Sequence, residues 1–229
     1  CPELGKDADW LEQFKASYLS DPSKGGLRAW QALYQCSPRV EGGNLVRREW
    51  WKFYRKQDFN AFGTTVISVD ATFKDMDTND FVAIEVWSKL NGNYYLRYCL
   101  NRHLDFPRTL QAIRLVKHLF PETMYILIED KANGSAVIDV VRRKVHGVIA
   151  VNPRDSKESR LNAVSTLFES HNVILPHVSL APWLRDYVSE MLQFPAGAHD
   201  DQIDATTQAL SDLQTAGRIA PENMMALRR

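Results

Sequence analysis

Acidic residues stand at three points of this sequence where an apolar run ends or a helical stretch begins. They are Asp70, Glu129, Asp130, Asp200, Asp201 and Asp204. Clustered carboxylates repel one another and are costly to bury unless a cation neutralises them. Oxygen-only ligands favour Mg²⁺ or Mn²⁺, and two such ions about 3.5–4 Å apart promote phosphodiester hydrolysis. We therefore expect a metal site suited to phosphodiester chemistry, with a divalent ion as its partner.

Two choices among these acids stay open at the level of sequence. Period-2 alternation sends Glu129 and Asp130 to opposite faces of a strand and does not decide which one turns inward, so we favour Glu129 and keep Asp130 as the alternative. Asp201 and Asp204 share a helix face at i and i+3, whereas Asp200 is rotated by about 100° from Asp201. We therefore favour Asp201 over Asp200. An Asp that precedes a helix is also a common N-cap, so each acid alone has a purely structural interpretation.

The elements that must position these acids follow from residue 63 onward. Apolar and β-branched runs predict strands at 64–69, 81–90, 94–100, 124–128, 148–151 and 173–175, with Asn91-Gly92 as a hairpin turn. Helical spacing predicts helices at 107–119, 135–144, 156–170, 181–192 and 201–213. Three antiparallel strands followed by alternating short strands and helices indicate an α/β fold, a mixed sheet flanked by helices. Ligand sites in such sheets lie at the carboxyl ends of the strands, where the acids would meet.

Composition narrows the class of protein. With 45% hydrophobic and 24% charged residues, the 229-residue chain is typical of a globular protein. Lys plus Arg and Asp plus Glu are 28 each, so any nucleic-acid surface must be local. Cys1, Cys36 and Cys99 have no metal-site spacing, which fits a reducing cytosol and argues against zinc. No apolar run approaches the roughly 20 residues of a membrane span, and the start of the chain does not resemble a signal peptide.

Three stretches resemble the nuclease motifs of terminase large subunits, the DNA-packaging enzymes of bacteriophages and prophages. They are Ser68-Val69-Asp70-Ala71-Thr72, Ile128-Glu129-Asp130-Lys131-Ala132-Asn133-Gly134 and His199-Asp200-Asp201-Gln202-Ile203-Asp204-Ala205. Lys157 with Arg160, and Asn172-Val173-Ile174-Leu175-Pro176, look like the family's segment between the second and third motifs. The resemblance covers about residues 30 to 213 and implies a ribonuclease H-like sheet.

The resemblance also implies an activity and roles for individual residues. The family cuts concatemeric double-stranded viral DNA with this domain, using two Mg²⁺ or Mn²⁺ ions. By resemblance, Asp70, Glu129 and Asp201 are catalytic metal ligands, and Asp204 is a further ligand or supports one. Lys131 and Arg160 are candidates to contact DNA phosphates, which adds affinity without reading sequence. His199 could hydrogen-bond a metal-bound group, although a His before a helix is more often structural.

The first 62 residues read differently, as helix and linker. Trp30 to Pro38 and Glu49-Trp50-Trp51 look like the family's junction between ATPase and nuclease domains. We expect the end of an ATPase domain and a linker at 1–62, the nuclease domain at 63–215 and a tail at 216–229. The chain contains no Gly-x-x-x-x-Gly-Lys-Ser/Thr phosphate loop.

The resemblance further implies partners and a location. The partners are the ATPase domain, the terminase small subunit and the portal, in the host cytoplasm and without a membrane. The rival interpretations are a Holliday-junction resolvase or transposase-like nuclease, and a non-catalytic docking module of the packaging motor. Metal dependence would separate the enzymes from the docking module.

Overall fold

The structure, a computed structural model, describes residues 8–20, 45–55, 63–71, 80–130, 135–197 and 199–215. The chain divides into two compact units, residues 1–44 and 45–229. In the first unit the described part is helix α1 (Ala8–Ser20), where Trp10 stacks on Phe14 with ring centroids 4.8 Å apart. The predicted tail at 216–229, the DNA-contact candidate Lys131 and the junction-like stretch at 30–38 lie outside the described residues.

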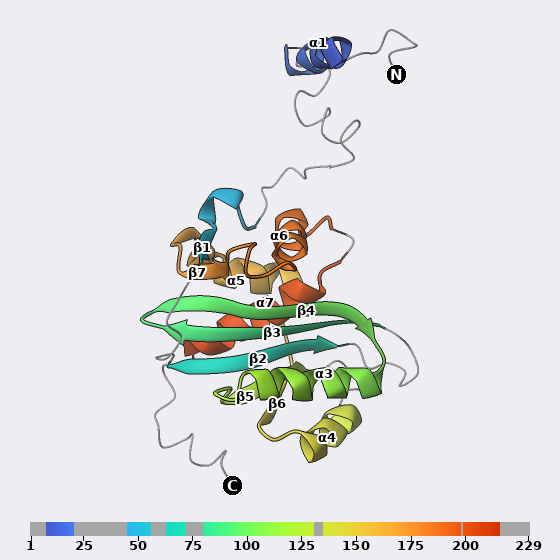
Figure 1. Ribbon diagram of the computed structural model, residues 1–229, viewed down its shortest axis with the longest axis vertical. Coiled ribbons are helices and arrows are strands. Elements are labelled where there is room, and N and C mark those ends of the chain that lie inside the picture. The colour runs from blue at the N-terminus through green and yellow to red at the C-terminus, as the bar shows by residue number, and fades with distance from the viewer. Residues whose placement is uncertain are drawn as a thin grey trace. The chain divides into compact units, whose positions relative to one another are not determined.

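Seven strands of the second unit form one mixed sheet in the order β1-β7-β4-β3-β2-β5-β6 (Figure 1). Their bounds are β1 Lys52–Tyr54, β2 Thr64–Ala71, β3 Asp80–Leu90, β4 Asn93–Leu104, β5 Tyr125–Glu129, β6 Val148–Val151 and β7 Val173–Pro176. β2, β3 and β4 pair antiparallel, whereas β5, β6, β7 and β1 join through parallel pairs. The predicted hairpin turn is confirmed, because Asn91 and Gly92 adopt positive φ angles of 50° and 80° between β3 and β4.

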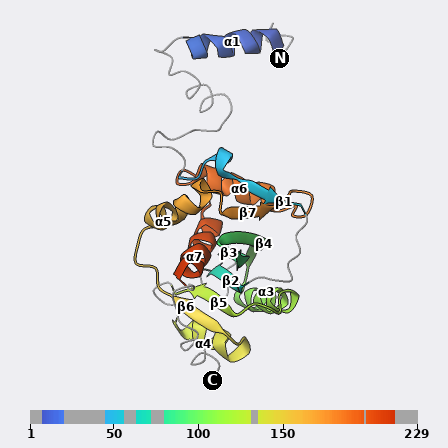
Figure 2. The same ribbon diagram turned by 90° about the vertical axis from the view of Figure 1, so that its left-hand side faces the viewer.

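Helices cover both faces of this sheet (Figure 2). They are α3 Phe106–Leu119, α4 Ser135–Lys144, α5 Lys157–Glu169, α6 Leu184–Gln193 and α7 Asp201–Thr215. Strand alternation creates the two cores: Val66 of β2 belongs to the core with α5, α6 and α7, and its neighbour Ile67 belongs to the core with α3 and α4. None of the helices that the structure describes has the length and apolar character needed to span a bilayer.

One strand was not expected from the sequence. Residues 45–55, assigned above to a linker, belong to the sheet unit, because Val46 is fully buried and β1 pairs in parallel with β7. A short 3-10 helix, η3 (Arg48–Trp50), precedes this strand, and Trp51 packs edge-on against Phe168 of α5 at 5.5 Å. The three residues of β1 are too few to show the alternation that predicts a strand. The strand also depends on a partner more than 100 positions away in sequence.

Candidate metal centre

Three buried carboxylates meet where β2, β5 and α7 come together. Asp70 lies near the end of β2, Glu129 is the last residue of β5, and Asp204 lies in the first turn of α7. One carboxylate oxygen from each side chain lies within 4.8 Å of the other two. The three residues are exposed to only 2%, 4% and 0%, so their charges are largely shielded from water. Such a group of oxygen donors suits a hard divalent cation.

The strand register brings Asp70 and Glu129 together. β2 and β5 run parallel with Val69 opposite Ile128, so the next residue on each strand is one of the two acids. Leu127 packs in the core beneath α7 and Ile128 in the opposite core. Alternation therefore turns Glu129 toward α7 and the following residue away from it.

Buried polar contacts fix the helix that carries the third acid. The hydroxyl of Ser68, which shares a strand face with Asp70, donates a hydrogen bond to the backbone oxygen of Ala205 at 2.7 Å. The side-chain amide of Gln208 donates to the same hydroxyl at 2.9 Å. Ser68 is fully buried, so these two bonds hold α7 against β2 immediately after Asp204.

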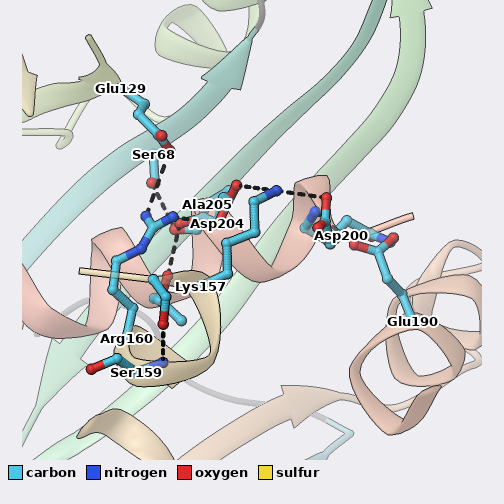
Figure 3. Close-up of polar contacts among 12 residues, drawn as sticks. Ser68, Glu129, Lys157, Ser159, Arg160, Glu190, Asp200, Asp204 and Ala205 are labelled. Atoms are coloured by element: carbon cyan, nitrogen blue, oxygen red, sulfur yellow. Dashed lines mark hydrogen bonds and ion pairs between the residues drawn. The ribbon is translucent and has the colours of Figure 1, made fainter. Parts of the chain in front are cut away.

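Two basic side chains of α5 reach the carboxylates (Figure 3). The guanidinium of Arg160 lies 2.7 Å from an oxygen of Asp204 and 3.6 Å from an oxygen of Glu129. The ammonium of Lys157 lies 2.7 Å from the other oxygen of Asp204 and 2.6 Å from Asp200. The hydroxyl of Ser156 caps α5 by accepting from the backbone N–H of Ser159 at 3.2 Å.

These ion pairs set the charge balance of the centre. Partial burial lowers the pKa of Lys157, but hydrogen bonds to Asp200 and Asp204 and the charges of both acids raise it more, so its pKa lies above the ordinary value. Lys157 is therefore charged at neutral pH. Among the described residues, Lys157 and Arg160 are the cations paired with these carboxylates, and Asp200 shares Lys157 with Asp204. A divalent ion bound by Asp70, Glu129 and Asp204 would add positive charge to this buried group.

Of the two acids on α7 that the sequence analysis directed toward the metal site, the structure brings one into the buried group. The analysis favoured Asp201, with Asp204 beside it, whereas the three-carboxylate group contains Asp204 and not Asp201. Residues at i and i+3 differ by about 60° and by about 4.5 Å along the axis, so sharing a helix face does not place both acids at one point. Asp201 instead lies where its charge raises the pKa of Glu190 on α6.

The remaining candidates lie around the centre rather than in it. Asp130, the alternative to Glu129, is half-buried, and its backbone N–H donates to Val151 at 2.7 Å. The ring of His199 is exposed, and its centroid lies 4.6 Å from that of the Phe81 ring. The sequence analysis gave no role to Ser68. It placed Lys157, with Arg160, only in a segment that resembles the family's, although the i, i+3 spacing of the two residues indicates a shared helix face.

Another buried carboxyl, outside the three-carboxylate group, lies under α7. Glu85 of β3 is fully buried, opposite Ser68 in the β2–β3 register. It accepts hydrogen bonds from the indole N–H of Trp87 at 2.7 Å and from the hydroxyl of Thr206 at 2.9 Å. Burial raises the pKa of Glu85 to about 8, although these two hydrogen bonds lower it in part. Glu85 therefore holds its proton well above the ordinary carboxyl range.

Comparison with known proteins identifies related sequences and folds. The family described as "Terminase RNaseH-like domain" matches residues 67–213. No curated protein sequence matches the chain.

Among solved structures, the large terminase of a thermophilic bacteriophage superposes with a TM-score of 0.57 at 10% identity, covering 75% of this chain and 45% of that one. The large terminase nuclease of thermophilic phage G20c superposes with a TM-score of 0.53 at 13% identity, covering 74% of this chain and 98% of that one. The same nuclease with bound magnesium superposes with a TM-score of 0.52 at 14% identity, covering 76% of this chain and 98% of that one. This chain thus spans less than half of the first of these terminases, and the predicted ribonuclease H-like fold is confirmed.

Proposed function

Because this chain belongs to the Terminase RNaseH-like domain family, we propose that it is a metal-dependent endonuclease that cuts concatemeric double-stranded viral DNA during genome packaging. The observation that carries the proposal is the buried group of Asp70, Glu129 and Asp204, whose oxygens lie within 4.8 Å of one another. The G20c nuclease, with which this chain shares its fold, has been solved with magnesium, cobalt and zinc.

The donor set supports binding of Mg²⁺ or Mn²⁺. Asp70, Glu129 and Asp204 offer carboxylate oxygens alone, which hard divalent cations prefer. Two bound ions would activate a water and stabilise the leaving 3′ oxygen of a phosphodiester. The protein's own part is to hold the three carboxylates together, through the β2–β5 register and the Ser68 contacts to α7. Asp201, one turn before Asp204, is retained as a proposed ligand of the second ion.

Basic residues beside the carboxylates would bind the DNA backbone. Arg160 already lies at the centre, where its guanidinium can exchange a carboxylate for a phosphate of DNA. Lys131, directly after the second motif, is the other proposed phosphate contact. Phosphate contacts of this kind give affinity without sequence specificity, which suits an enzyme that a motor holds on its DNA.

The rest of the motor supplies the proposed partners. Residues 1–62, apart from residues 45–55 of the sheet unit, would contain the end of an ATPase domain and a linker, and residues 216–229 a tail. The thermophilic phage terminase of which this chain spans less than half has been solved in complex with ADP and with ATP-gamma-S. We propose that the ATPase domain, the terminase small subunit and the portal act together with this nuclease in the host cytoplasm.

A docking module without catalytic activity is the second candidate. The observation that favours it is the pairing of Lys157 and Arg160 with the carboxylates, because these ion pairs partly compensate the buried charge without a metal. In that case the acids would serve to pack α5 against α7. Resolvases and transposases use similar carboxylates, but the family match favours the terminase assignment.

Plasmid cleavage tests the proposal. The purified chain would be incubated with Mg²⁺, Mn²⁺ or EDTA and compared with Asp70→Asn, Asp204→Asn and Asp201→Asn. We expect metal-dependent cleavage that falls by at least about 100-fold when a direct ligand is lost. Asp139→Asn, which changes an exposed acid of α4, is the matched control and should cleave like the natural chain.

Calorimetric titration with Mn²⁺ separates the two candidate functions. Binding that is lost in Asp70→Asn together with metal-dependent cleavage supports the nuclease. An absence of metal binding would contradict it and favour the docking module. Cleavage that survives in both Asp70→Asn and Asp204→Asn would mean that these acids do not form the catalytic centre.

A further inference from the structure

A cavity of about 340 Å³ lies on the α6 side of the start of α7, and the three carboxylates of the metal centre do not line it. Its inner wall contains Cys99 and Asn101 of β4, Glu190 of α6 and Gln202 of α7. Phe81 and Trp183 add aromatic surface, and Asp186, Ser189 and His199 are exposed lining residues. A side chain can therefore enter from the surface and reach a buried polar wall.

The inner wall presents hydrogen-bond acceptors. The carboxylate of Glu190, which is 9% exposed, accepts from the backbone N–H of Gln202 at 2.8 Å and from its side-chain amide at 2.5 Å. The amide nitrogen of Asn101 donates to the same carboxylate at 3.5 Å. The side-chain oxygen of Asn101 is buried and accepts no hydrogen bond within the described part of the chain. A buried acceptor of this kind costs free energy until a donor reaches it.

The charge of the cavity is negative. Asp186 and Glu190 both line it, and within the described ranges neither forms an ion pair and no lining residue is Lys or Arg. Burial raises the pKa of Glu190, hydrogen bonds from Gln202 lower it in part, and the charge of Asp201 raises it again. A cation in the cavity would offset the cost of these buried charges.

We propose that this cavity binds the guanidinium group of an arginine side chain from a partner protein. A guanidinium supplies five N–H donors in one plane, enough for the Glu190 carboxylate and the Asn101 oxygen together. Its flat face also stacks on aromatic rings, and the ring of Trp183 lines the cavity. A nucleotide fits less well, because its phosphate would lie near the carboxylates of Asp186 and Glu190.

Peptide binding tests this inference without DNA and in the presence of EDTA, so its outcome is independent of the nuclease activity. The probes are a short neutral peptide with one arginine and the same peptide with citrulline, which keeps the shape and loses the charge. We expect saturable binding of the arginine peptide to the full chain, with NMR shifts at the Asn101 side-chain amide and Gly197. The citrulline peptide should bind at least about tenfold more weakly, which corresponds to about 1.4 kcal/mol.

Variants locate the binding in the cavity. Glu190→Gln should weaken binding of the arginine peptide at least about tenfold. Because Glu190 also contacts α7, Asp186→Asn provides a second variant at an exposed position, with a smaller loss expected. Glu169→Gln, which changes an exposed acid on α5, should bind like the natural chain. The proposal would be overturned if both peptides bound equally well, or if binding were unchanged in both cavity variants. It would also be overturned if deoxyadenosine monophosphate, and not the arginine peptide, caused NMR shifts in the cavity.

Discussion

Asp204 and Arg160 form a partly buried ion pair in which an oxygen of the carboxylate lies 2.7 Å from a guanidinium nitrogen, with side-chain exposures of 0% and 15%. Taking both charges out of water is costly, and their mutual attraction offsets that cost only while both partners are present. Arg160 therefore supplies positive charge to the carboxylate group in the protein without metal. The stability of the fold and the affinity for a divalent ion should depend on this same pair.

Replacing Arg160 with glutamine should destabilise the metal-free protein. Breaking a buried pair typically costs about 3–5 kcal/mol, and we expect about 2 kcal/mol here because Lys157 still pairs with Asp204. Mg²⁺ should restore part of the loss, since a bound cation takes over the missing charge. Urea denaturation in EDTA and in Mg²⁺ measures both effects.

Arg142→Gln is the matched control for this variant. Arg142 pairs with Asp139 on the surface at 3.4 Å with exposures of 48% and 59%, so its loss should cost less than about 1 kcal/mol. Equal losses in the two variants would show that the Arg160 pair contributes no more than an ordinary surface pair.

Lys157 should compete with the metal ion. Its ammonium lies 2.7 Å from Asp204, so removing this charge leaves the carboxylate more negative toward an incoming cation. We expect Lys157→Gln to bind Mn²⁺ about three- to fivefold more tightly, a modest effect because Lys157 is one-third exposed and screened. Lys157→Arg retains the charge and should bind Mn²⁺ like the natural chain. Weaker binding in Lys157→Gln, measured by calorimetry, would mean that Lys157 helps to shape the metal site.

The sheet and its main helices could be predicted because their signals are local. Val66, Ile67 and their neighbours alternate between the two cores, as a strand covered on both faces requires. β1 was not predicted, because its three residues are too few to show alternation and the strand forms by pairing with β7.

The acids were easier to find than to assign. Sequence marks Asp70, Glu129 and the acidic start of α7, because each follows an apolar run or opens a helix. The sequence directs both Asp201 and Asp204 toward the metal site, and which of them lies beside Asp70 and Glu129 depends on the depth at which α7 lies on the sheet. The Ser68 contacts set that depth, and they join residues more than 130 positions apart in sequence.

Glu85 should make stability depend on pH. Burial raises its pKa from 4.5 to about 8, so the folded state favours the neutral carboxyl. Its contribution to stability is fully present below about pH 4.5 and is lost as pH rises toward about 8, because the unfolded chain ionises first. Glu85→Gln removes the titrating group, and should reduce the loss of stability over this range.

Urea denaturation from pH 5 to pH 9, compared between Glu85→Gln and the natural chain, measures this effect. The difference in the free energy of unfolding should grow with pH, by an amount on the order of a few kcal/mol. Ser159→Ala, which changes an exposed side chain that does not titrate, should leave the pH profile unchanged. Parallel profiles for Glu85→Gln and the natural chain would mean that Glu85 has the same pKa in the folded and unfolded states.

Ser68→Ala should weaken metal binding although Ser68 is not a ligand. The change removes the hydrogen bonds to Ala205 and Gln208, and should cost about 1–3 kcal/mol of stability because buried polar groups lose their partner. It also frees the start of α7, so we expect affinity for Mn²⁺ to fall about tenfold, as when a residue that orients a ligand is lost. Thr65→Val is the control, because Thr65 lies on the same strand as Ser68 and strand alternation turns it away from α7. The change removes the 2.8 Å contact between the hydroxyls of Thr65 and Ser88. If both variants lose stability and metal affinity in the same proportion, Ser68 acts through general stability and does not position Asp204.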